Sequence, residues 1–306
     1  EVDTLAWKRD ASFWTQVREL PLREDELWSY HVKDSLSGSD SLSRTSGDSN
    51  EVVLSIDENP KSVFGKVTQG GVWKMNEKLS LRYGGVMGGL KEYNFTDGLW
   101  IGQTLSLNYA YGMNRNFVFS PSLYYATARR EWLWYVSSSW KYAPLSLGRL
   151  YLAAGHISRD VNGENGESRL MNTITAIGLG QNFIRFYDSR YVKAENSIDI
   201  ANGLQLRTGA EIERRSPLSN RTSFNFIGKD VPENIPSDAA LYPNHTAAHI
   251  ALELSYTPRY RYRVREGRKW YVSSKYPTLR IAYKKGFNPL GSSNLAPSYA
   301  RISASV

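Results

Sequence analysis

Long segments of alternating apolar and polar residues constrain the fold of this chain more than any other feature. Between residues 99 and 111 the odd positions are mostly apolar, and the even positions are small or polar. The apolar set is Leu99, Ile101, Leu105, Leu107, Tyr109 and Tyr111, and it alternates with Gly102, Thr104, Ser106, Asn108 and Ala110. Successive side chains of a strand point to opposite faces, so this period of two predicts a two-sided β-strand.

The same alternation recurs later in the chain, and helical spacing fits none of these segments. It is found in residues 117–125, 132–142, 204–212, 248–256 and 279–284. Ordinary strands run about 5 to 6 residues, whereas a tilted strand that crosses a bilayer needs about 9 to 11. The pattern predicts roughly ten to twelve strands of the longer kind, starting near residue 61.

The predicted connections differ in size. Those at residues 112–116 and 129–131 are tight, while those at 159–168 and 228–244 are long, polar and contain Gly or Pro. Outer-membrane barrels place short turns on one rim and long loops on the other. We therefore predict an all-β, transmembrane antiparallel β-barrel of the outer-membrane type over residues 61–306. Residues 1–60 are predicted to form a polar lead-in with a Ser-rich linker.

Composition agrees with a barrel but also allows a soluble alternative. The 39 aromatic residues make up 13% of the chain, and amphipathic rings collect at membrane interfaces. Mean hydropathy is −0.47, which barrel strands also give because lumen-facing positions are polar. The alternative is a soluble all-β binding protein rich in aromatic residues.

Charge and cysteine content exclude several functions. The chain has no cysteine, which removes disulfides, thiol nucleophiles and thiolate metal sites. The net charge of +8 comes from Lys and Arg spread through the strands, which does not favour nucleic acid as a partner. No export signal is seen at Glu1, so we expect it to have been removed or not included.

Several segments together resemble one family. They are SFWTQVRELPLREDE (12–26), YNFTDGLW (93–100), RRSPLSNRTSFNF (214–226) and, most specifically, YTPRYRYRVREGRKWYVSSKYPTLRIAYKKGF (256–287). The chain resembles the Bacteroidetes outer-membrane proteins named for a carboxypeptidase-like regulatory domain, whose barrel is a domain of unknown function. The resemblance implies flanking segments at both ends and no peptidase activity. The final SYARISASV lacks the terminal aromatic of outer-membrane barrels, so we expect missing strands or an unusual closure.

Two motifs superficially suggest chemistry. His245 and His249 form HTAAH, but Thr246 replaces the glutamate of a zinc-protease motif and spacing fixes no third ligand. We expect a histidine pair at the lumen or rim and no metal.

Glycines 84, 85, 88 and 89 in YGGVMGGLK resemble a phosphate loop. However, Leu90 stands where its lysine should be. We expect a turn or bulge and no nucleotide.

Glu211 and Glu213 share a strand face with Arg207 and could form an acid–base pair. Charge ladders on the polar face of a barrel explain them equally well, so no catalytic residue is predicted. A barrel that acts as an enzyme on lipid or peptide at its rim would need an acid, a base or a nucleophile grouped in one site, and the sequence shows no such group.

The strongest candidate site is a cationic stripe. Arg259, Arg261, Arg263 and Arg265 alternate with Tyr260, Tyr262 and Val264. Arginine forks bind phosphate or carboxylate, so the stripe is a candidate for lipopolysaccharide phosphates, lipid headgroups or an anionic solute. The alternative is a solvated rim.

We thus expect a non-enzymatic outer-membrane protein without cofactors that acts in transport or envelope assembly. The alternative is a scaffold that binds lipopolysaccharide or envelope protein partners.

Overall fold

The computed structural model describes residues 62–163, 167–234, 244–288 and 298–305, all of which belong to one compact unit, Asn59–Val306. The lead-in and linker predicted for residues 1–60 lie outside the described residues. So do parts of the two long connections predicted at residues 159–168 and 228–244.

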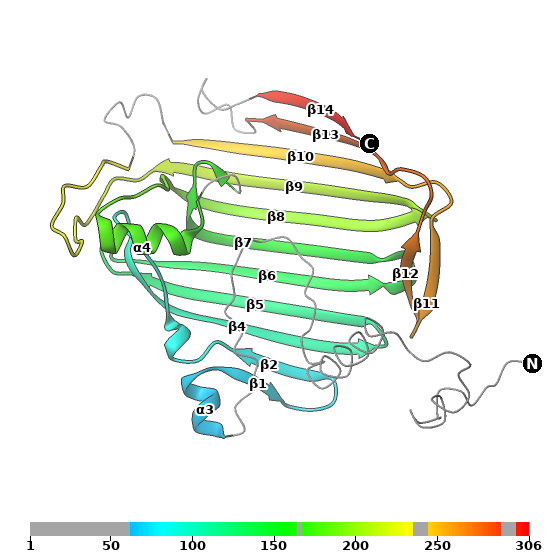
Figure 1. The fold of residues 1–306 in the computed structure, drawn as a ribbon, viewed down its shortest axis with the longest axis horizontal. Coiled ribbons are helices and arrows are strands. Elements are labelled where there is room, and N and C mark those ends of the chain that lie inside the picture. Colours follow the sequence, from blue (N-terminus) through cyan, green and yellow to red (C-terminus); the bar gives the residue numbers. More distant parts are fainter. Residues whose placement is uncertain (1–61, 164–166, 235–243, 289–297, 306) are drawn as a thin grey trace, which may run out of the picture. The chain divides into compact units, whose positions relative to one another are not determined.

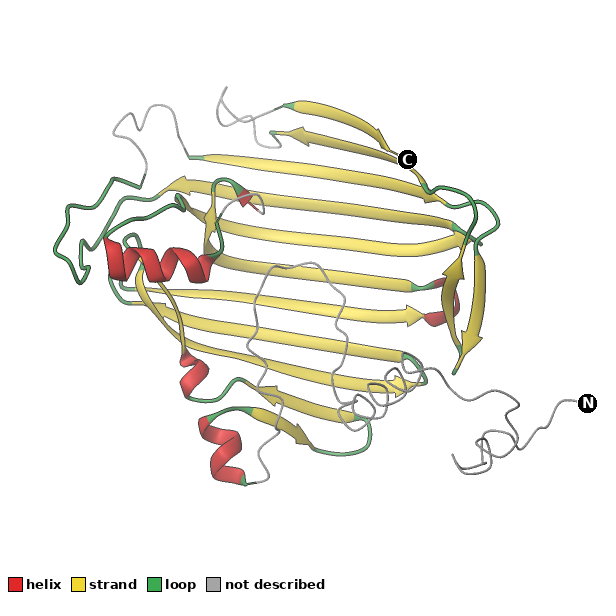
Figure 2. Cartoon of the chain, in the orientation of Figure 1, coloured by secondary structure: helices red, strands yellow, loops and turns green. Residues whose placement is uncertain are grey.

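The described residues form an antiparallel sheet of twelve strands and a separate two-stranded hairpin (Figures 1 and 2). The strands are β1 (Gly71–Lys74), β2 (Leu79–Tyr83), β3 (Leu90–Asn94), β4 (Gly98–Gly112), β5 (Arg115–Ala126), β6 (Glu131–Ala143), β7 (Gly148–Asp160), β8 (Phe186–Ala201), β9 (Leu204–Pro217), β10 (His245–Tyr256), β11 (Arg261–Arg265), β12 (Arg268–Ser273), β13 (Leu279–Phe287) and β14 (Tyr299–Ser305). The helices are α3 (Val63–Thr68), α4 (Arg169–Leu179) and the short 3-10 turns η2 (Met87–Gly89) and η3 (Pro144–Ser146). The predicted all-β, antiparallel fold is confirmed.

The strand order is β1-β2-β4-β5-β6-β7-β8-β9-β10-β13-β14, with β3 added on β4 and with β11 and β12 forming the hairpin. Within the described residues β1 pairs only with β2, and β14 pairs only with β13. The sheet is therefore open here and does not close as the predicted barrel would. Alternation makes a strand two-sided, but closure depends on strand number, tilt and stagger, which alternation does not encode.

The registers place the alternating residues of all the long strands on two continuous faces. One row runs Phe117, Trp140, Leu150, Asn196, Thr208, Leu252, Tyr283 and Ile302 through successive directly paired positions. We call the face that carries this row the apolar face. The other is the polar face, and it carries Arg159, Glu211 and His249, among others.

The two ends of the sheet carry different connections. At what we call the loop end lie the connections 127–130, 161–185, 218–244 and 288–298. At the hairpin end lie 113–114, 144–147, 202–203 and 257–278, the last of which contains β11 and β12. The two tight turns expected to share a rim are therefore at opposite ends, because β5 separates them. Each strand reverses direction, so successive turns must alternate between ends.

The two clusters of buried apolar side chains among the described residues lie at the loop end. One cluster joins Trp100, Tyr124, Ala126 and Leu133, and a second joins Tyr93, Phe95 and Ala176 of α4. Helix α4 packs against β3 and was not predicted from the sequence. No helix in the described part of the chain has the length and apolar character needed to cross a membrane.

Candidate functional site

The β11–β12 hairpin lies across the hairpin end of the sheet (Figure 1). At its base, Asn202 of the β8–β9 turn donates a hydrogen bond to the carbonyl oxygen of Tyr260 at 2.9 Å. At its tip, Asn114 of the β4–β5 turn donates to the carbonyl oxygen of Glu266 at 2.6 Å. Between these points β12 contacts η3 in the β6–β7 connection. The hairpin is thus held to three successive turns of the sheet.

A buried ion pair fixes one face of the hairpin to the sheet. The Nζ atom of Lys269 lies 3.0 Å from Oδ2 of Asp199, and the Tyr271 hydroxyl donates to the same oxygen at 2.7 Å. The amide of Gly203 donates to that hydroxyl at 2.8 Å. Burial alone would lower the pKa of Lys269, but its hydrogen bonds with Tyr271 and Asp199 outweigh this effect and raise it. The lysine therefore stays charged.

Aromatic contacts complete this attachment. The rings of Tyr260 and Tyr271 stack with centroids 4.1 Å apart, and Lys269 Nζ lies 4.9 Å from the centroid of the Tyr262 ring. Stacking and cation–π contacts of this kind add to the ion pair. The attachment uses none of the predicted stripe's arginines.

The opposite face of the hairpin gathers cations. Arg263 lies directly opposite Trp270, and Arg265 lies directly opposite Arg268. Residues two apart on a strand share a face, so Arg261 joins the same surface. We call this surface the arginine face; it comprises Arg261, Arg263, Arg265, Arg268 and Trp270. The Trp270 side chain is 49% exposed, and Arg268 lies 4.5 Å from its ring centroid.

The stripe predicted from sequence is placed in part as expected. Arg261, Arg263 and Arg265 alternate on β11, but Arg259 lies in the preceding turn with a left-handed φ of 47°. Its Nη1 donates to the Tyr276 hydroxyl at 3.2 Å, away from the others.

Arg268 was missed because its place depends on a two-residue turn. Both Glu266 and Gly267 have positive φ, as a type I′ hairpin requires. This turn brings Arg268 back beside Arg265.

Like charges lie side by side at the hairpin end. Besides Arg265 and Arg268, Lys141 of β6 pairs directly with Arg149 of β7. Arg268 is also close enough to repel Lys141. Within the described residues none of these cations forms an ion pair with a carboxylate. Positive charge is therefore uncompensated at the hairpin end. Like charges in directly opposed positions also destabilise a sheet.

A cavity of about 410 Å³ opens beside the arginine face. It is lined by Tyr260, Arg261, Tyr262, Arg263, Val272 and Ser273. Aromatic walls with two guanidinium groups suit a ligand that is partly apolar and carries a negative charge.

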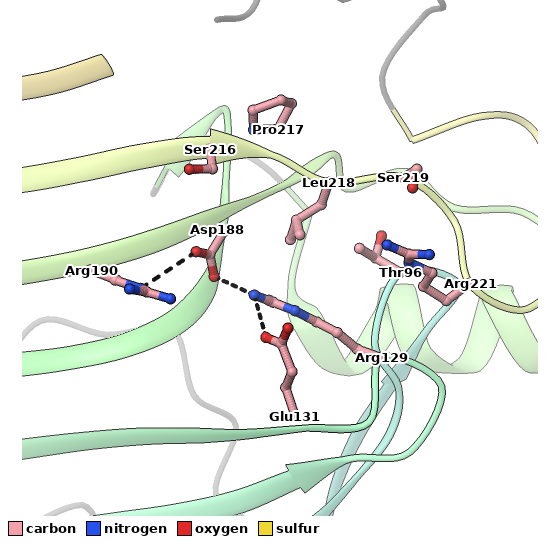
Figure 3. A pocket seen from close by; sticks show the side chains of 10 residues that line it. All are labelled: Thr96, Arg129, Glu131, Asp188, Arg190, Ser216, Pro217, Leu218, Ser219 and Arg221. Carbon is pink, nitrogen blue, oxygen red and sulfur yellow. Dashed lines mark hydrogen bonds and ion pairs between the residues drawn. The ribbon is translucent and has the colours of Figure 1, made fainter. Parts of the chain in front are cut away.

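The loop end also contains charged residues, and there Arg129 is buried and paired with Asp188 and Glu131 (Figure 3). The Nη2 atom of Arg129 lies 2.6 Å from Oδ1 of Asp188 and 2.8 Å from Oε2 of Glu131. Burial alone would lower the pKa of Arg129, but Asp188, Asp97 and Glu131 outweigh it and raise it. The adjoining cavity of about 230 Å³ is lined by Thr96, Arg129, Glu131, Asp188, Arg190, Ser216, Pro217, Leu218, Ser219 and Arg221.

The predicted pair Glu211 and Glu213 belongs to an ion-pair ladder on the polar face. Both carboxylates bind Arg159, and Glu213 also accepts from Arg215 at 2.6 Å. Arg207, grouped with them from sequence, lies instead 3.7 Å from Glu253. Pairing across strands, which sequence spacing does not give, sets the partners Arg159 and Glu253, whereas Arg215 lies two residues from Glu213 on β9.

The two histidines of HTAAH lie on the polar face of β10, opposite Arg215 and Glu211. Four residues along a strand separate them by about 13 Å, too far to share one metal ion. His249 Nε2 lies 3.5 Å from Glu211 instead. The described residues contain no group of three or more His, Asp or Glu that could hold a metal ion.

The glycine cluster forms a turn. Gly85 has a φ of 79°, and Gly88 and Gly89 belong to η2. A Cβ at Gly85 would meet the backbone of residues 68–70 at 2.3–2.7 Å. Glycine is needed here for close backbone approach, as the predicted turn implies.

These features define an all-β protein whose broad antiparallel sheet exposes one apolar face and bears a cationic hairpin at one end. A family model described as "Family of unknown function (DUF5686) C-terminal domain" matches residues 65–306, and the chain therefore belongs to this family. No curated protein and no solved structure gives a significant match. The match carries neither the carboxypeptidase-like name nor the Bacteroidetes origin of the expected family.

Proposed function

We propose that the sheet is part of the wall of a transmembrane β-barrel in a bacterial outer membrane, with a non-enzymatic role in transport or envelope assembly. The observation that carries this proposal is the exposure of the apolar face. Its exposed large side chains are Ile101, Leu105, Tyr109, Phe117, Phe119, Leu123, Trp132, Trp134, Trp140, Leu152, Val192, Ile212, Ile250, Leu252, Leu254, Tyr256, Leu279, Ile281 and Ile302. Exposed apolar patches of this extent mark interaction or membrane surfaces.

Strand length supports the same proposal. Strands β4 to β10 run from 12 to 16 residues, more than the roughly 9 to 11 that a tilted membrane strand needs. The polar face, which carries the Arg159 ladder, would then line the lumen.

The positions of aromatic residues along the strands also support the proposal. Tyr125 and Trp132 pack together at the loop end of β5 and β6, with ring centroids 5.2 Å apart. Trp140 donates to the Tyr111 hydroxyl at 2.6 Å near the hairpin end. From residue 132 to residue 140 a strand rises about 26 Å at about 3.3 Å per residue. At a tilt of roughly 35–45° this length projects to about 20 Å along the membrane normal, close to the apolar band of about 25 Å between the two aromatic girdles of outer-membrane barrels.

The resemblance to Bacteroidetes outer-membrane proteins with a carboxypeptidase-like regulatory domain adds to this proposal. It favours the outer membrane as location and a barrel that is completed by further strands. Lipid or lipopolysaccharide and envelope proteins are the partners that such a location implies.

A pair of neighbouring substitutions tests the membrane assignment. Phe119 lies on the apolar face and is 39% exposed, whereas Ser120 lies on the polar face. Arginine on the lipid face near the bilayer centre costs about 2–4 kcal/mol, so Phe119→Arg should strongly reduce folding into lipid vesicles. Ser120→Arg is the matched control and should fold nearly as the wild type.

A chain that stays in the aqueous fraction without detergent, and in which both variants fold equally well, would reject the membrane wall in favour of a soluble binding protein. Conductance in planar bilayers then separates the two roles. An open channel supports transport, and a closed barrel that co-purifies with envelope proteins supports assembly.

A further inference from the structure

We propose that the arginine face of the β11–β12 hairpin binds the phosphate groups of anionic lipid headgroups at the membrane surface. This inference rests on the proposed function, since it takes the sheet to stand in a bilayer. It adds a ligand class and names the residues that bind it.

The first argument is the uncompensated charge. Arg265 and Arg268 occupy directly opposed positions, and within the described residues no carboxylate pairs with either. Buried arginines of the sheet are matched instead, as Arg129 is by Asp188 and Glu131. Because opposed like charges destabilise a hairpin, an anion that binds between them removes a repulsion as well as forming new hydrogen bonds.

The second argument is the chemistry of the donors. Guanidinium groups offer planar forks that bind phosphate oxygens in pairs. Arg261, Arg263 and Arg265 recur at alternate positions, which spaces their backbones about 7 Å apart along β11. A row of headgroups, each with its own phosphate, can engage such a row better than one compact anion can.

The third argument concerns which phosphate carrier fits. Trp270 shares the face with the arginines and is 49% exposed. Asn114 binds the hairpin tip to the β4–β5 turn, close in sequence to Tyr109 and Tyr111 of the aromatic group at the hairpin end. Aromatic rings beside basic residues are typical of the headgroup level of a membrane. A freely dissolved phosphate would need no exposed tryptophan, so we commit to lipid headgroups.

The arginines are not needed to hold the hairpin in place. Lys269, Asp199 and Tyr271 make the attachment on the other face. Substitution of the arginines should therefore change ligand binding while leaving the hairpin folded.

The test compares two triple variants of the purified protein in neutral detergent. One is Arg263→Gln, Arg265→Gln and Arg268→Gln. The matched control is Lys74→Gln, Lys78→Gln and Arg82→Gln, which removes the same charge from the exposed β1–β2 hairpin, where described residues show no opposed like-charge pair. Phosphatidylglycerol or phosphatidylcholine is added, and bound lipids are counted by native mass spectrometry.

Each cation near an anionic bilayer surface raises affinity about fivefold, so the loss of three predicts a drop on the order of a hundredfold for phosphatidylglycerol. The control variant and the phosphatidylcholine arm should change little. Arg263→Gln alone, which removes no opposed pair, should lower the affinity for phosphatidylglycerol about fivefold. This single variant replaces the triple variant in the test if the triple variant does not fold.

Equal retention of phosphatidylglycerol by the arginine variant and the control overturns the proposal. So does a site that prefers inorganic phosphate, seen as full displacement of phosphatidylglycerol at modest phosphate concentration. Bilayer insertion is scored separately with Phe119→Arg. One outcome separates the two proposals. If the chain does not insert into bilayers, but the arginine variant binds anionic vesicles less tightly than the wild type does, the membrane wall is refuted and the arginine face is still supported as a lipid-binding surface.

Discussion

Arg129 at one end of the sheet and Arg263 and Arg265 at the other lie in opposite environments. At the loop end Arg129 is buried, with a side chain 8% exposed, and contacts three carboxylates. At the hairpin end Arg263 and Arg265 are exposed, and within the described residues they have no carboxylate partner. A buried charge must be paired to be tolerated, whereas an exposed one need not be. Arg129 is therefore a structural residue, whereas Arg263 and Arg265 leave charge available for a ligand at the hairpin end.

The largest predicted effect comes from replacing one arginine by methionine at each end of the sheet and comparing the losses of stability. Arg129→Met leaves the fully buried Asp97 without its cation and removes the nearest arginine from Asp188, which keeps Arg190 at 3.9 Å. Breaking a buried pair in this way costs about 3–5 kcal/mol. Arg263→Met at the hairpin end removes an exposed side chain and should cause no comparable loss. Urea unfolding followed by tryptophan fluorescence measures both, and equal losses would remove the contrast between the ends.

A smaller effect is expected where the hairpin is attached. Lys269→Met leaves the carboxylate of Asp199, whose side chain is 1% exposed, without its ion pair. Because the Tyr271 hydroxyl still donates to Asp199, the cost should be nearer that of one lost hydrogen bond to a charged group, about 1.5–3 kcal/mol, and it should release the hairpin rather than unfold the sheet.

Limited trypsin digestion detects the release of the hairpin directly. The Lys269→Met variant should be cut faster between residues 259 and 268, with the rest of the sheet intact. Uniform acceleration of cleavage along the chain, or none, contradicts a local attachment.

The pH dependence of stability should arise at the loop end. Burial raises the pKa of Asp97, against the opposing hydrogen bond from Ser158 and the charge of Arg129. A carboxyl whose folded pKa lies above its unfolded value contributes stability at low pH and loses it as pH rises through the folded pKa. Asp97→Asn removes this loss.

The measurement for Asp97 is the slope, against pH, of the difference in unfolding free energy between the variant and the wild type. The unfolding free energy of Asp97→Asn relative to wild type should increase from acidic to neutral pH, even though the lost hydrogen bonds lower it by a constant amount. A difference that is flat across that range shows that Asp97 ionises as freely in the folded protein as in the unfolded one.

Much of the sheet could be predicted because period-two alternation is a local property. The segment predicted at residues 99–111 is β4, Gly98–Gly112, and that at 248–256 lies within β10. Helix α4 was missed although Ser168 caps its N-terminus and Gly180, with a φ of 65°, ends it. Those two residues are the usual boundary signals of a helix.

The candidate site was predictable only where it is local. Alternation placed Arg261, Arg263 and Arg265 on one face, but Arg268 reaches them through a turn with no Asn-Gly or Asp-Gly signature. The Arg129 cluster was not predictable at all. It joins residues 97, 129 and 188 from three separate connections and strands, and strand pairing rather than sequence spacing brings them together.

The smallest predicted effect bears on the hairpin end alone. Because Arg265 and Arg268 repel each other across the hairpin, Arg268→Gln should raise stability by a few tenths of a kcal/mol in the absence of anionic lipid. Added salt should shrink this gain, since screening weakens the repulsion between exposed charges. With phosphatidylglycerol present the sign should reverse, because the wild type then gains a ligand that the variant binds less tightly. Thermal unfolding of the two proteins with and without phosphatidylglycerol measures this reversal, and a gain that persists in its presence shows that Arg268 does not contact the lipid.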